Sequence, residues 1–102
     1  MFLAIRSMFA AKERVNIRFK GFLSDASFQF NIQRMISEIG LLGWMRVTTM
    51  QGVEIEVEGP RPKLDELIKR VQPLATSARL SSMDVNWRSY SGKLEDFRIR
   101  NN

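Results

Sequence analysis

Apolar and polar residues alternate along several short stretches of this chain, and such alternation is typical of strands that bury one face. The clearest case is residues 13–20, where Val15, Ile17 and Phe19 alternate with basic and amide side chains. Four later stretches follow the same rule. The pattern predicts four strands and a short fifth one, over residues 13–20, 43–49, 52–58, 80–88 and 97–99.

Two other segments repeat their apolar residues three or four positions apart, which is the spacing of a helix. In the first segment the repeat runs from Phe28 to Ile39, and Gly40 then suits the left-handed end of a helix. Three residues are candidates for its N-cap: Ser24, Asp25 and Ser27.

The second helical segment carries its apolar stripe over residues 64–71. Pro62 is well placed near its start, because the first turn of a helix does not use the N–H group that proline lacks. Pro73 is expected to end the helix, since a proline ring inside a helix clashes with the preceding turn.

The elements therefore follow the order β-α-β-β-α-β with a short final strand, which is the ferredoxin-like split βαβ arrangement of the α+β class. An antiparallel sheet with charged side chains on one side implies one solvated face and one face covered by both helices. We place Glu54, Glu56 and Glu58 on the solvated face. The chain divides into an extension, residues 1–12, and one domain, residues 13–100.

Composition excludes several kinds of chemistry. The 102 residues include neither cysteine nor histidine, so disulfides, thiol nucleophiles, thiolate metal sites and a histidine base are excluded. We expect neither a metal nor a cofactor.

No apolar run is long enough to span a membrane, and Arg6 interrupts the apolar start that a secretory signal needs. We expect a cytoplasmic monomer.

The formal net charge of +5 suits an anionic partner, although scattered basic residues also serve solubility. One basic cluster shares a face of the first predicted strand: Lys12, Arg14, Arg18 and Lys20. Residues 20–22 (Lys-Gly-Phe) are similar to the start of the aromatic strand motif of RNA-recognition domains. They lead into a helix instead of a central strand, and Phe28 and Phe30 are interpreted as core or near-core residues. We therefore do not expect a nucleic acid as partner.

Three further runs of residues point to a particular family. They are residues 39–46 (Ile-Gly-Leu-Leu-Gly-Trp-Met-Arg), 53–60 (Val-Glu-Ile-Glu-Val-Glu-Gly-Pro) and 96–100 (Asp-Phe-Arg-Ile-Arg). With these runs, residues 13–100 resemble the acylphosphatases. The resemblance implies the split βαβ fold and metal-free hydrolysis of the carboxyl-phosphate bond of acyl phosphates.

In that family a loop of backbone N–H groups and an Arg bind the phosphate, and an Asn orients the attacking water. The resemblance places the Arg position on Gln29 and the Asn position on Val47. Within the loop, Phe22 stands where the family has Arg, and Asp25 adds a negative charge where an anion should bind. The loop equivalents are Gly21, Phe22, Leu23, Ser24, Asp25, Ala26 and Ser27.

These substitutions predict an acylphosphatase-like domain whose hydrolysis is lost or strongly impaired. Such a domain would bind a small ligand, for instance an acyl phosphate or another small anion, or an unidentified protein partner. The alternative is an active acylphosphatase that uses Lys20 and the loop amides in place of the missing Arg.

Overall fold

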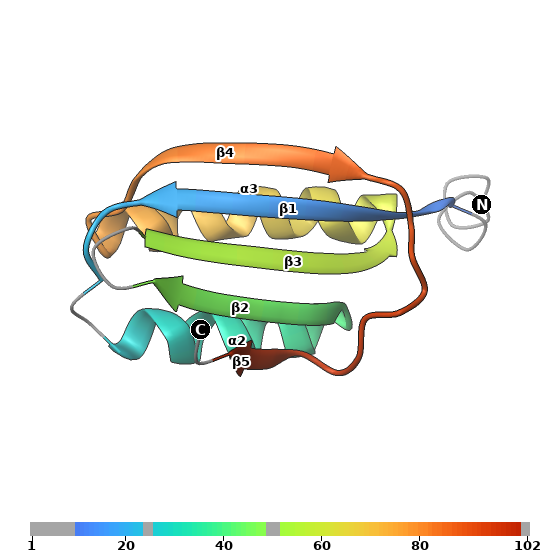
Figure 1. Ribbon diagram of the computed structural model, residues 1–102, viewed down its shortest axis with the longest axis horizontal. Coiled ribbons are helices and arrows are strands. Elements are labelled where there is room, and N and C mark those ends of the chain that lie inside the picture. Colours follow the sequence, from blue (N-terminus) through green and yellow to red (C-terminus); the bar gives the residue numbers. More distant parts are fainter. Residues whose placement is uncertain (1–9, 24–25, 49–51, 101–102) are drawn as a thin grey trace.

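Five strands and two helices make up the part of the chain that the structure describes (Figure 1). This computed structural model describes residues 10–23, 26–48 and 52–100. The elements are β1 (Lys12–Lys20), α2 (Ala26–Ile39), β2 (Leu42–Thr48), β3 (Gly52–Pro60), α3 (Arg61–Ser77), β4 (Ser81–Arg88) and β5 (Arg98–Arg100). Their order confirms the predicted β-α-β-β-α-β arrangement. Most of the predicted extension, residues 1–9, lies outside the described residues, and Lys12 already belongs to β1.

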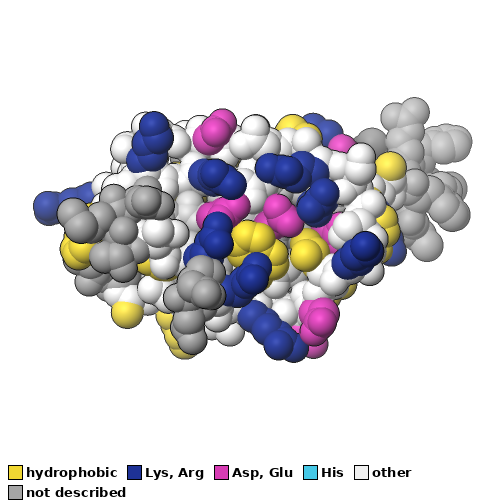
Figure 2. Space-filling model, in the orientation of Figure 1, with side chains coloured by type: hydrophobic (Ala, Val, Ile, Leu, Met, Phe, Trp, Pro, Cys, Tyr) yellow, Lys and Arg dark blue, Asp and Glu magenta, His cyan; other side chains and the backbone are white. Residues whose placement is uncertain are grey.

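The strands form one sheet in the order β4-β1-β3-β2-β5. β1 is antiparallel to β3 and β4, and β3 is antiparallel to β2. β5 departs from the predicted antiparallel sheet, because it follows a connection across the end of the sheet and pairs parallel to β2 (Figure 1). Both helices cover one face of the sheet, as predicted. We call the opposite face, which Figure 2 shows, the open face.

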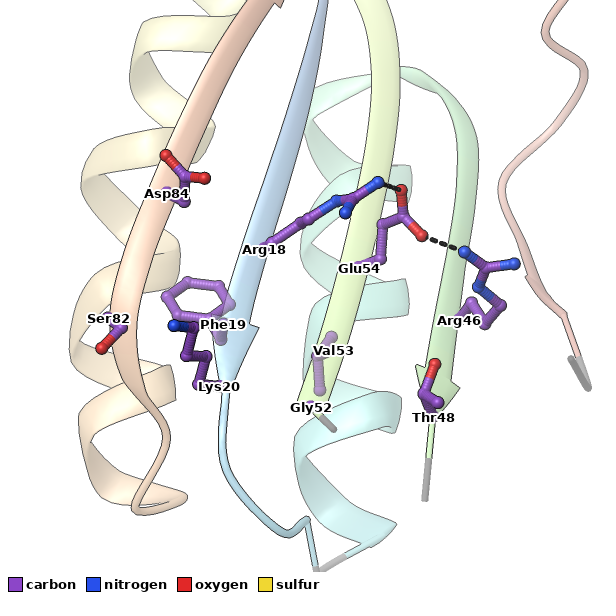
Figure 3. A pocket seen from close by; sticks show the side chains of 10 residues that line it. All are labelled: Arg18, Phe19, Lys20, Arg46, Thr48, Gly52, Val53, Glu54, Ser82 and Asp84. Atoms are coloured by element: carbon purple, nitrogen blue, oxygen red, sulfur yellow. Dashed lines mark hydrogen bonds and ion pairs between the residues drawn. The ribbon is translucent and has the colours of Figure 1, made fainter. Parts of the chain in front are cut away.

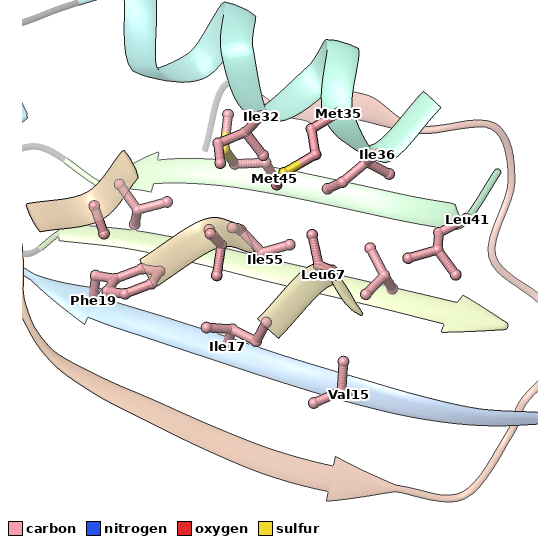
Figure 4. Close-up of a cluster of buried hydrophobic side chains, with 14 of the residues drawn as sticks. Val15, Ile17, Phe19, Ile32, Met35, Ile36, Leu41, Met45, Ile55 and Leu67 are labelled. Carbon is pink, nitrogen blue, oxygen red and sulfur yellow. The ribbon is translucent and has the colours of Figure 1, made fainter. Parts of the chain in front are cut away.

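The hydrophobic core lies between the sheet and the two helices (Figure 4). Ile17 and Ile55 face it from β1 and β3, and Ile32 faces it from α2; all three side chains are fully buried. Each fully buried side chain of this size contributes about 1.5–3 kcal/mol relative to an exposed one. The alternating apolar residues of the strands and the helical repeat of α2 therefore both mark side chains of this one core.

The helix α2 buries one stripe and exposes the other. Phe28 is buried, as predicted, whereas Phe30 exposes 64% of its surface. The prediction that Phe30 lies in or near the core is wrong, because two helical positions correspond to about 200° of rotation. Gly40 ends the helix as predicted, with φ of +86° and its N–H donated to the carbonyl of Ile36 at 2.9 Å.

The helix α3 contradicts the prediction that Pro73 ends it, because it continues to Ser77 with Pro73 inside. Pro73 itself is exposed, and the next turn places Ala75 in the core. The burial of this turn offsets the backbone hydrogen bond that proline cannot make. Neither described helix is long and apolar enough to cross a membrane.

Candidate functional site

The loop that the resemblance singles out joins β1 to α2 at one end of the sheet (Figure 1). Gly21 has φ of +131°, and Phe22 exposes 62% of its surface. Leu23 instead packs against the core. Two predicted loop positions and N-cap candidates lie outside the described residues: Ser24 and Asp25. The last two loop positions already begin α2: Ala26 and Ser27. The described loop residues therefore present an exposed aromatic side chain and no cation.

Gln29 is the fourth residue of α2 and is half-buried. The first N–H groups of a helix have no partner within the helix, so this end of α2 can attract an anion. Gln29 adds a neutral amide to that end. It can donate a hydrogen bond, but it lacks the charge and the two parallel donors with which an Arg holds a phosphate.

Val47 lies on β2 near the same end of the sheet and packs against the core. It pairs in register with Val53, which in turn pairs with Phe19 on β1. Both of these neighbours are buried. Val47 thus continues an apolar row across three strands, and its side chain has no atom that can hydrogen-bond a water.

Lys20 ends β1 and belongs to the open face. Its neighbour Phe19 is buried in the core, and side chains alternate between the two faces of a strand. Lys20 lines a depression on the open face together with Arg18 and Arg46 (Figure 3). Because Val47 packs on the helix-covered face, Lys20 and Val47 lie on opposite sides of the sheet. Arg46 likewise lies opposite Val47, as its position in the strand predicts.

An ion-pair network crosses the open face next to this depression. Glu54 accepts hydrogen bonds from Arg18 at 3.0 Å, from Asn16 at 2.8 Å and from Arg46. Asn16 is only 1% exposed, and its amide donates to Glu54 and Glu56 and accepts from Arg18. Burial by itself would raise the pKa of Glu54, but the hydrogen bonds from Asn16 and Arg46 outweigh it, and the net pKa lies below the usual value. Glu54 therefore remains ionised.

The carboxylates on this face are less solvated than predicted. Glu54 and Glu56 are half-buried, and Glu56 pairs with Arg14 at 3.2 Å. Glu58 is only 3% exposed, so its prediction as a solvated side chain is wrong. In the described part of the chain, no group of three or more acidic side chains is arranged to hold a metal ion.

Glu58 holds the connection between β4 and β5 against β3. Its Oε2 accepts hydrogen bonds from the backbone N–H and the hydroxyl of Ser91, the latter at 2.6 Å. Burial by itself would raise the pKa of Glu58. The hydrogen bonds from the Ser91 side chain and from the backbone N–H groups of Ser91, Leu94 and Gly92 outweigh it, so the net pKa is lowered.

A group with a lowered pKa in the folded state stabilises the fold above its unfolded pKa and loses that effect as the pH falls through the folded value. We expect the Glu58→Gln variant to lose roughly 1.5–3 kcal/mol of unfolding free energy at pH 7, as for hydrogen bonds to a charged group. The loss should shrink as the pH falls below 4.5, the ordinary value for Glu58. Urea unfolding between pH 3 and pH 7 measures it. Glu66→Gln, at an exposed position of α3, is the control, and an equal loss in both variants would contradict the role of Glu58.

Sequence reasoning missed the surroundings of Trp44. The Arg100 guanidinium lies 4.9 Å from the Trp44 ring centre and that of Arg46 lies 5.7 Å from it. Trp44 is therefore half-buried beneath charged groups on the open face and does not belong to the core. The alternation on β2 places Trp44 and Arg46 on one face, but the approach of Arg100 depends on the parallel pairing of β5, for which the sequence carries no signal.

Comparison with known proteins agrees with the fold. The acylphosphatase family profile matches residues 15–99. An acylphosphatase from Salinibacter ruber is 30% identical over 87% of this chain and 94% of its own length. One from Caldivirga maquilingensis is 34% identical over 82% of this chain and 86% of its own length. The solved acylphosphatase from Bacillus subtilis matches with a TM-score of 0.77 at 20% identity, over 86% of this chain and 98% of that one.

Proposed function

Because this chain belongs to the acylphosphatase family, we propose that it is a small-anion-binding domain of that fold whose acyl-phosphate hydrolysis is lost or strongly reduced. The observation that carries the proposal is the pair of side chains at the two reactive positions of the family. Gln29 offers an uncharged amide at the start of α2, and Val47 packs against the core. The exposed Phe22 in the loop adds no charge that could replace an Arg.

The expected loss of hydrolysis rate can be estimated from the contribution of single catalytic groups to the rates of enzymes. Removing one preorganised donor from a transition-state site costs about 10²–10³ in rate. Two groups lost together give a scale of about 10⁴, although groups that act as a unit do not contribute additively. Such a loss would leave the loop amides and the helix N-terminus to bind an anion without hydrolysing it.

The second candidate is a working acylphosphatase, and the names of the similar proteins favour it. In that case Lys20 would replace the missing Arg. Its position argues against this, since Lys20 shares the open face with Arg18 and Arg46, whereas Val47 packs on the other face. If Lys20 nevertheless supports turnover, Lys20→Ala should abolish it.

Hydrolysis of benzoyl phosphate tests the proposal. We expect the kcat/KM of this chain to lie about 10³-fold or more below that of the Bacillus subtilis acylphosphatase measured under the same conditions. The Lys20→Ala variant should leave the residual rate unchanged. A natural chain as fast as the Bacillus subtilis protein would contradict the proposal, and a Lys20→Ala variant without residual activity would favour the second candidate.

A further inference from the structure

The open face contains a depression of about 310 Å³ at the end of the sheet (Figure 3). It lies over the ends of β1 and β3, with β2 on one side and β4 on the other. Most of the side chains around it are polar or charged, among them Lys20, Arg46, Thr48, Ser82 and Asp84, and Phe19 and Val53 add apolar surface. A space of this size is at the lower end of the range that small-molecule sites occupy.

The Arg46 side chain lines this depression and uses only part of its guanidinium for Glu54. Its terminal nitrogen pairs with Glu54. Its Nε is buried and has no hydrogen-bond partner. Nε has almost no surface open to the depression, so a ligand there would meet only the exposed end of the Arg46 side chain, which is 35% exposed. A guanidinium has five N–H donors, so this end can still donate to an oxygen ligand.

Two further charges around the depression are not used by the network. Lys20 and Asp84 form no ion pair with any other residue in the described ranges, whereas Arg18 and Arg46 share the carboxylate of Glu54. The three cations around the depression exceed the two carboxylates by one charge. This balance suits a ligand with a single anionic group and disfavours a polyphosphate, which Asp84 and Glu54 would repel.

We propose that this depression binds a small oxyanion, a carboxylate or a phosphate monoester, through Arg46, Lys20 and the hydroxyl of Thr48. The site lies on the open face and is separate from the family loop, which leads into α2 on the covered side. It therefore does not depend on whether the chain hydrolyses acyl phosphates. It also gives Lys20 a role that its position supports better than replacement of the missing Arg.

Titration of the ¹⁵N-labelled chain with inorganic phosphate, and separately with acetate, tests the site by the shifts of backbone amide signals. We expect the largest shifts at Lys20, Thr48 and Ser82, with the tighter of the two probes identifying the class of ligand. Arg46→Lys keeps the charge but removes the multi-donor guanidinium, and Lys20→Ala removes the other cation. Each should weaken binding roughly tenfold, the effect of one hydrogen bond to a charged group.

Asp84→Asn should strengthen binding a few-fold, because it removes a repelling charge. Lys69→Ala, which removes an exposed charge from α3, is the matched control and should change nothing. The proposal is overturned if neither probe binds, if Arg46→Lys and Lys20→Ala bind as tightly as the natural chain, or if the shifts centre on Gly21, Phe22 and Gln29. The last outcome would place the anion at the family loop. A benzoyl phosphate assay on the same samples reports separately on the proposed loss of hydrolysis.

Discussion

The double variant Gln29→Arg with Val47→Asn is expected to hydrolyse benzoyl phosphate about 10²-fold or more faster than the natural chain, in line with the effect of one restored transition-state donor. The introduced arginine would supply a charged, two-donor contact at the start of α2. The introduced asparagine would offer an amide to the attacking water at the end of β2. Initial rates at several substrate concentrations, at a temperature where both proteins are folded, measure the gain in kcat/KM.

The single variants separate the two contributions. Gln29→Lys restores the charge without the fork of the guanidinium, so it should recover less activity than Gln29→Arg. Val47→Asn places an amide against the core and should cost about 1–3 kcal/mol of unfolding free energy. Thermal unfolding of each variant must therefore accompany the assay. A folded double variant without any gain would contradict the assignment of these two positions as the missing chemistry.

If the folded double variant is inactive, the loop itself is the next cause to test. Asp25 adds a negative charge to the residues that should surround a phosphate, and Gly stands at that position in the family pattern. Adding Asp25→Gly to the double variant should then restore activity, because it removes the repulsion and frees the backbone to turn toward the ligand. This third substitution distinguishes two causes of inactivity: the missing Arg and Asn side chains, and a loop that no longer binds phosphate.

Most of the fold could be predicted because alternation and helical spacing both report burial. Ile17 and Ile32 are examples, since each falls in the core from a different kind of element. The incorrect predictions concern packing between residues that a local sequence pattern does not contain. Pro73 lies inside α3 because Ala75 packs in the core after it. The expectation that proline ends a helix considers Pro73 alone and does not include the burial of Ala75.

The chemistry of the open face was less predictable, because it depends on pairing between distant strands. The sequence places Arg46 and Glu54 on polar stripes, but only the β2–β3 register sets them opposite each other. Glu58 is a second example of this dependence on distant residues. The alternation of apolar and polar residues along its strand predicts a solvated side chain, but the connection at Ser91 buries it. The substitutions at Gln29 and Val47, in contrast, could be recognised directly, since they depend on motifs that are continuous in the sequence.

Replacing Gly43 by Ala is expected to destabilise the fold by roughly 2–5 kcal/mol, the sum of about 1–3 kcal/mol for overpacking and about 1–2 kcal/mol for an unfavourable backbone conformation. Gly43 lies at the start of β2 with φ of +151°. A Cβ atom there would lie 2.0 Å from the carbonyl oxygen of Glu56 and 2.8 Å from the Cα of Val57. Both are backbone atoms of β3, so the two strands would have to separate.

Gly92→Ala is the matched control, because it changes a glycine with positive φ where there is room. Gly92 has φ of +68°, and the nearest atom to its Cβ position is a Tyr90 ring carbon at 3.4 Å. Its cost should be about 1–2 kcal/mol, from the backbone conformation alone. Urea unfolding followed by tryptophan fluorescence compares the two variants with the natural chain. Equal losses would contradict the clash with β3, whereas a larger loss for Gly43→Ala would explain in physical terms why the Gly-Leu-Leu-Gly-Trp run needs its second glycine.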